Sequence, residues 1–176
     1  MRRCAPGLAA VALLASTLLT ACGGGPPARV WAASVCTALQ PWRTELGNLT
    51  TKAQEQANAA PNPAQAKENL VRLFDGAEKT TDAARSKVEA AGIPDVANGR
   101  TIAQGFVATL TAVRDAYGHA KTGIGGLTSS DPKTFSDGVA GVLNTLNTEW
   151  QQSSPDVTRL DSVELRKAFD EVPECQ

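Results

Sequence analysis

The sequence predicts an all-α protein, an antiparallel four-helix up-and-down bundle followed by a short C-terminal helix. Apolar residues recur every three or four positions in four long stretches, which is the period of one helix face. Asparagine or aspartate followed by proline opens two of these stretches, and no stretch shows the sustained alternation of a half-buried strand. A bundle follows because mutual packing buries all four apolar faces.

The first helix is expected to start near Trp31. Its apolar positions are separated by steps of three or four: Trp31, Val35, Leu39, Trp42, Leu46, Leu49, Ala53 and Ala57. Pro41 lies inside this stretch, where it lacks an N–H and crowds the carbonyl four residues earlier. Because the apolar face keeps its phase across Pro41, we expect one bent helix rather than two unrelated helices.

Asn62 and Pro63 supply an N-cap and a first-turn proline for the second helix. Its apolar face comprises Ala66, Leu70, Leu73, Phe74, Ala77, Ala84, Val88 and Ala91, and Gly92 is expected to end it. The third helix is expected to begin near Asp95. It carries Ile102, Phe106, Leu110, Val113, Tyr117, Ala120 and Ile124, and we expect Gly123, Gly125 and Gly126 to terminate it.

Asp131 and Pro132 repeat the cap-and-proline pattern before the fourth helix. Its apolar positions are Phe135, Val139, Val142, Leu143, Leu146 and Trp150. The tail from Pro155 contains a shorter apolar set: Leu160, Val163, Leu165, Phe169 and Val172. This tail predicts a short broken helix that brings Cys175 back toward Cys36.

Composition limits the function classes. The 176 residues, 42% hydrophobic and 20% charged, fit one globular domain. Seventeen basic and 18 acidic residues give a net charge of -1, which disfavours nucleic acid as a partner. The single histidine, His119, has no nucleophile motif or Glu-x-x-His spacing near it. We therefore expect no metal, no cofactor and no enzyme activity, and interpret His119 as a surface or boundary residue. The alternative is a general base with carboxylates that folding brings near it.

Residues 1–21 have the organisation of an export signal. Arg2 and Arg3 precede an apolar run from Gly7 to Leu19, and small residues follow it. The run is shorter than the roughly 20 residues that a membrane-spanning helix needs.

Leu19, Thr20, Ala21 and Cys22 resemble the lipobox of bacterial lipoproteins. The resemblance implies cleavage before Cys22, a diacylglyceryl anchor on its sulfur, and a location on the outer face of the cell membrane. The alanine- and threonine-rich, lysine-poor composition is similar to that of small exported helical lipoproteins of actinobacteria, and it assigns no activity. The expected organisation is a cleaved signal (1–21), a lipidated Gly/Pro tether (22–29) and a bundle domain (30–176).

The tether composition, Gly23 to Arg29, predicts a flexible segment that reaches at most about 25 Å. The bundle should therefore stay close to the bilayer.

Four cysteines take three predicted roles. Cys4 lies in the signal and Cys22 takes the lipid, so Cys36 and Cys175 are left for the mature domain. An even pair in an exported domain predicts a disulfide, which would close a loop of about 140 residues and add about 5 kcal/mol of stability. The alternatives are a buried free pair or a redox couple, although no Cys-x-x-Cys spacing is present.

The leading functional hypothesis is a lipid-anchored, non-enzymatic binding or accessory protein of the cell envelope, acting with a protein partner. An alternative is a carrier of a small apolar ligand. Trp31 and Trp42 share a helix face, and a cavity between helices could lie beside them. The other outcome for these tryptophans is a filled core.

Overall fold

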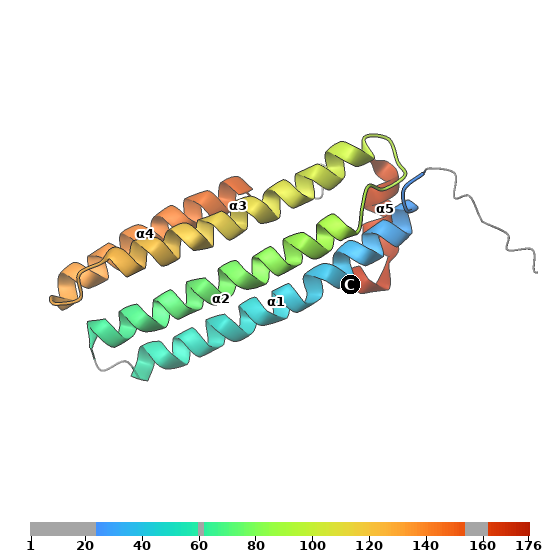
Figure 1. The fold of residues 1–176 in the computed structure, drawn as a ribbon. Coiled ribbons are helices and arrows are strands. Elements are labelled where there is room, and N and C mark those ends of the chain that lie inside the picture. The colour runs from blue at the N-terminus through green and yellow to red at the C-terminus, as the bar shows by residue number, and fades with distance from the viewer. Residues whose placement is uncertain (1–23, 60–61, 154–161) are drawn as a thin grey trace, which may run out of the picture.

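The computed structural model describes residues 24–59, 62–153 and 162–176, and these form helices and connections without a strand. The elements are α1 (Ala28–Ala59), α2 (Pro63–Ala90), α3 (Gly99–Gly126), α4 (Pro132–Ser153), α5 (Val163–Glu171) and the 3-10 helix η2 (Pro173–Cys175). The four long helices run up and down as an antiparallel bundle (Figure 1). The predicted fold class, with its short C-terminal helix, is confirmed.

Side-chain caps begin the helices where the sequence predicts. Asn62 accepts a hydrogen bond from the Gln65 amide at 3.0 Å before α2, and Asp131 accepts one from the Thr134 amide at 2.7 Å before α4. These bonds satisfy amides that have no partner inside the helix. Gly92 follows α2 with a φ of 76°, a left-handed conformation that glycine adopts without steric cost.

The third helix differs from its prediction at its start. It begins at Gly99 rather than near Asp95, because Asn98 has a left-handed φ of 58° and interrupts the helical backbone. The helix ends at Gly126, the last of the three glycines that were expected to terminate it, and Gly123 and Gly125 lie inside its final turn. Ile124 is fully buried, and its packing offsets the roughly 1 kcal/mol that each glycine costs inside a helix.

Pro41 does not divide the first helix. α1 is one helix from Ala28 to Ala59 with Pro41 inside it. A single helix across the proline agrees with the continuous phase of the apolar face.

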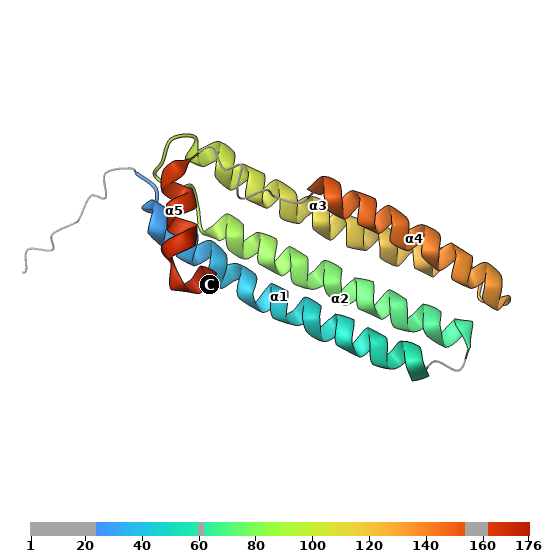
Figure 2. The same ribbon diagram turned by 180° about the vertical axis from the view of Figure 1, so that it is seen from behind.

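The helices have unequal lengths, and this sets the arrangement. α4 has 22 residues, about 33 Å, whereas α2 and α3 have 28 residues each, about 42 Å. We call the end with the start of α1, the α2–α3 connection and α5 the proximal end, and the opposite end the distal end. α4 lies along the distal part of α3, and α5 crosses the start of α1 at the proximal end (Figure 2).

The unequal lengths divide the interior into two cores. The proximal core joins α1, α2, α3 and α5: Ala28, Trp31, Ala32, Val35, Ala38, Val88, Ile102, Ala103, Phe106, Leu110, Leu165, Ala168 and Val172. The distal core joins α2 and α3 with half-buried residues of α4, and its buried members are Phe74, Ala120 and Ile124. The short helix α5 therefore contributes apolar side chains to the proximal core, as α4 does to the distal core.

A disulfide joins Cys36 of α1 to Cys175 of η2, 139 residues later in the chain. This confirms the predicted pair. Beside it, Arg29 of α1 donates a hydrogen bond to Glu171 of α5 at 2.6 Å. The covalent bond and the ion pair hold the C-terminal segment across the first helix.

Ion pairs link the exposed edges of α2 and α3. Asp82 accepts from Arg85 at 2.9 Å and from Arg114 of α3 at 3.2 Å, and Lys121 of α3 pairs with Glu78 and Asp75 of α2. The hydrogen bonds from Arg85 and then Arg114 hold the pKa of Asp82 below its ordinary value of 3.8. The charges therefore favour the packed arrangement of α2 and α3 when the carboxylates are ionised.

We predict that Cys36→Ser lowers the melting temperature of the helical bundle by on the order of 10 to 20 °C, because it opens the long loop that the disulfide closes. Cys175→Ser and the double variant should melt at the same temperature as Cys36→Ser, since all three remove one bond. Thermal circular dichroism measures each. A melting temperature that stays at the wild-type value in Cys175→Ser contradicts the predicted stabilisation.

The ion pairs predict a pH dependence of stability. The lowered pKa of Asp82 means that its stabilising effect is complete above pH 3.8 and is lost as the pH falls through the lower folded-state pKa. Urea unfolding from neutral to acidic pH should therefore show a shallower acid loss in Asp82→Asn than in the wild type. Asp137→Asn is the control, because Asp137 pairs with Lys133 of its own helix α4. Equal acid slopes in wild type and Asp82→Asn would show that the ion pairs do not stabilise the bundle.

Candidate functional site

The predicted lipidation residue, Cys22, and the remainder of the lipobox lie outside the described residues. The described chain begins at Gly24 and reaches α1 along the α2–α3 connection. The Asp95 amide donates a hydrogen bond to the Pro26 carbonyl at 2.9 Å. A Cβ atom on Gly25 would lie 1.7 Å from the carbonyl oxygen of Ile93, so the backbones approach here as only glycine allows.

These contacts differ from the flexible tether that the sequence predicted. The sequence assigned residues 22–29 to a flexible segment, but Gly24 to Pro27 lies against the bundle and α1 already begins at Ala28. The described part of the segment is therefore held at the proximal end rather than extended away from it.

Trp31 fixes this end of the bundle. Its side chain is completely buried, and its indole N–H donates a hydrogen bond to the Gly92 carbonyl at 2.8 Å. Its ring meets Phe106 edge-on at 5.4 Å and Phe169 at 6.1 Å between centroids. Trp31 thereby joins the start of α1 to the α2–α3 connection, against which the N-terminal segment lies.

Trp42 lies further along α1, where the two cores meet. Its indole N–H donates to the Thr81 hydroxyl at 2.9 Å, and that hydroxyl donates to the Ala77 carbonyl at 2.7 Å. The Trp42 ring stacks on Trp150 of α4 at 6.4 Å, and Trp150 contacts Tyr117 at 5.6 Å. Burial raises the pKa of Tyr117 to about 12.

Trp31 and Trp42 thus pack against different partners, with their N–H groups hydrogen-bonded inside the protein. A ligand cavity beside the two tryptophans stays a prediction.

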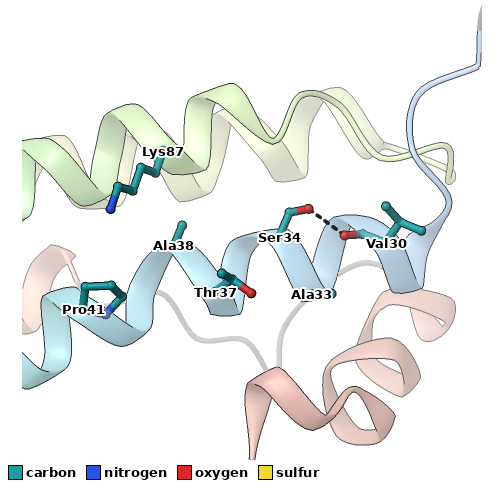
Figure 3. A pocket seen from close by; sticks show the side chains of 7 residues that line it. All are labelled: Val30, Ala33, Ser34, Thr37, Ala38, Pro41 and Lys87. Atoms are coloured by element: carbon teal, nitrogen blue, oxygen red, sulfur yellow. Dashed lines mark hydrogen bonds between the residues drawn. The ribbon is translucent and has the colours of Figure 1, made fainter.

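Two apolar grooves open near the proximal end. One runs along α1 with a volume of about 670 Å³ and is lined by Val30, Ala33, Ser34, Thr37, Ala38, Pro41 and Lys87 (Figure 3). The other, about 310 Å³, lies between the end of α2 and the start of α3 and is lined by Val88, Glu89, Gly92, Ile93, Ala103, Gln104, Val107 and Ala108. Val30 and Ile93 bring these two grooves to the same end as the N-terminal segment.

His119 lies on the surface of α3, with 68% of its side chain exposed. Its Nδ1 atom is 3.1 Å from the Glu149 carboxylate of α4, so folding does bring a carboxylate to this histidine. The described residues contain no group of three or more histidine, cysteine or acidic side chains that could hold a metal ion. Among the helices of residues 24–59, 62–153 and 162–176, none is long and apolar enough to cross a membrane.

Sequence reasoning missed the residues that receive the N-terminal segment, Ile93 and Asp95. Ile93 had a detectable signal, because a large apolar residue stood between the helix-ending Gly92 and Pro94. The glycines at positions 23–25 also admit two structural interpretations. A glycine run indicates close backbone approach as well as flexibility, and composition does not distinguish the two.

Comparison with protein-family models, with curated proteins and with solved structures gives no significant match to this chain.

We predict that Thr81→Val destabilises the protein by about 1–2 kcal/mol, because it leaves the half-buried indole N–H of Trp42 without its acceptor. Thr111→Val is the matched control, since the Thr111 hydroxyl donates only to Val107 of its own helix. Urea unfolding measures both variants. In a Trp42→Phe background the Thr81→Val penalty should shrink, and an unchanged penalty would exclude the hydrogen bond as its cause.

Proposed function

We propose that this protein is a lipid-anchored, extracytoplasmic helical bundle of a bacterial cell envelope, with a non-enzymatic binding or accessory role. The observation that carries the proposal is the sequence Leu19 to Cys22 directly ahead of the segment that enters the bundle at Gly24. Cleavage before Cys22 leaves every described helix intact, because α1 begins only at Ala28.

The disulfide supports export. Structural disulfides persist in oxidising compartments and are rare where thiols are kept reduced. Cys36 and Cys175 are 139 residues apart in the sequence, and their bond joins the first helix to the last turn of the chain. A bond in this position fits a domain that folds outside the cytoplasm.

The surface chemistry fits a binding role. His119 and Glu149 form an exposed pair, and the larger charged cluster of α2 and α3 is engaged in ion pairs between the helices. The His119 side chain is mostly exposed to solvent, whereas general-base catalysis is strongest in a site that positions substrate and tunes the base. The grooves at the proximal end are apolar and offer contact surface instead of reacting groups.

A second candidate is a carrier of a small apolar ligand. The groove along α1 favours it, because its volume of about 670 Å³ falls in the range of small-molecule sites and its lining includes Val30, Ala38 and Pro41. Native mass spectrometry of protein purified without detergent tests this role. A mass equal to that of the protein alone excludes a retained ligand.

For the anchor, we predict that bacteria fed a radioactive fatty acid incorporate label into the wild-type protein and that Cys22→Ala abolishes the labelling. Cys4→Ala is the matched control, because it removes a cysteine from the same N-terminal region but leaves the acceptor sulfur in place. Gel autoradiography with an immunoblot for protein amount measures the result. Label that survives Cys22→Ala, or an unlabelled mature wild-type protein, overturns the proposal.

A further inference from the structure

Exposed apolar side chains gather at the proximal end of the bundle. Four large hydrophobic residues are exposed in the part of the chain that the structure describes: Val30 at 54%, Ile93 at 38%, Leu143 at 42% and Val163 at 73%. Val30 lies in the first turn of α1, Ile93 in the α2–α3 connection, and Val163 begins α5. Single exposed apolar residues are ordinary on protein surfaces, but three of these four belong to elements of the same end of the bundle, which favours this end as a contact surface.

The N-terminal segment emerges at this same end. The Asp95 amide holds Pro26, and Gly25 lies against the Ile93 carbonyl. Cys22 is two residues before Gly24, so these residues are separated by at most about 7 Å. The polar layer of a bilayer is roughly 5 to 8 Å thick on each side, so a lipid on Cys22 would hold the proximal end at that layer.

The charges at the proximal end do not indicate binding to nucleic acid or to a strongly anionic surface. Arg29 is paired with Glu171, and the exposed residues of the α2–α3 connection and the start of α3 include both Asp95 and Arg100, so both signs are mixed here. A strongly basic patch would indicate attraction to anionic lipid or nucleic acid. The described residues instead present apolar groups beside an anchoring segment, which suits the boundary between lipid head groups and acyl chains.

We propose that the proximal end of the bundle rests on the membrane surface, with Val30, Ile93 and Val163 in contact with lipid. This inference relies on the proposed anchor at Cys22. The bundle then points its distal end, with the α1–α2 and α3–α4 connections, about 40 Å away from the bilayer. The docked segment from Gly24 to Pro27 fixes this orientation, because it leaves little free chain between the lipid and the fold.

Spin labels measure the orientation in the lipidated full chain, reconstituted into vesicles of phosphatidylethanolamine and phosphatidylglycerol. Ile93→Cys and Val163→Cys each carry a nitroxide, and Leu143→Cys on α4 is the control, because Leu143 matches Ile93 in exposure, although Val163 is more exposed than both. Each introduced thiol is the free one, since Cys36 and Cys175 are bonded and Cys22 would carry lipid. The ratio of collisions with oxygen to collisions with a polar nickel complex reports contact with lipid.

We expect this ratio to be about threefold or more higher at positions 93 and 163 than at position 143, and to persist in high salt. Equal ratios in protein that floats with the vesicles overturn membrane contact but leave the anchor intact. Low collision rates with both reagents at 93 and 163 mean that protein covers this end, and they also overturn the inference. Protein that fails to float overturns the anchor as well.

A second variant tests the docked segment. Gly25→Ala places a Cβ against the Ile93 carbonyl and should release the segment, so the ratio at position 163 should fall toward that at position 143 while flotation persists. Gly47→Ala is the control, because a Cβ there meets no atom within 4 Å. Circular dichroism verifies that both variants fold. An unchanged ratio in Gly25→Ala shows that the segment does not set the orientation.

Discussion

The fold depends on two helices, α4 and α5, that cover different parts of the apolar core. α4 is shorter than α1, α2 and α3 and packs mainly against α3, so it leaves the proximal part of the bundle uncovered. The nine-residue helix α5 covers that part with Leu165, Ala168 and the ring of Phe169. So short a helix has little stability of its own, because helix nucleation costs more than a few turns recover. The disulfide from Cys36 to Cys175 compensates by keeping α5 against α1.

The same end of the molecule has a second role. Trp31 ties α1 to Gly92, Asp95 holds Pro26, and α5 closes over the assembly. The N-terminal segment therefore enters the bundle at the end where these hydrogen bonds and the Cys36–Cys175 disulfide join the helices. A lipid attached just ahead of it would transmit position and orientation to a rigid body.

The distal half is constructed differently. The α4 residues that pack against it, Val139, Val142 and Leu146, are only half-buried, and Leu143 of the same helix is exposed. The helices there are joined by the Trp42–Trp150 stack and by the ion pairs of Asp82 and Lys121. Fewer fully buried apolar groups predict that local opening begins at the distal end. In the proposed orientation, this more adaptable end faces away from the membrane.

Local patterns determined much of this architecture. The helix faces, the caps at Asn62 and Asp131, the end of α2 at Gly92 and the pairing of two cysteines all follow from residues and their spacing. The helix faces and caps depend on the geometry of neighbouring residues, and the disulfide was predicted because only two cysteines were left to pair. The lipobox is likewise local, and the anchor that it implies remains a proposal.

Only the structure decided where α3 begins, because Asn98 adopts a left-handed backbone conformation that the sequence pattern did not indicate. It also decided that Gly24 to Pro27 lies against Ile93 and Asp95, and that Trp31 and Trp42 have separate partners. These contacts join residues far apart in the chain. Their free energy arises from packing and hydrogen bonds that exist only after the helices assemble, so no local pattern encodes them.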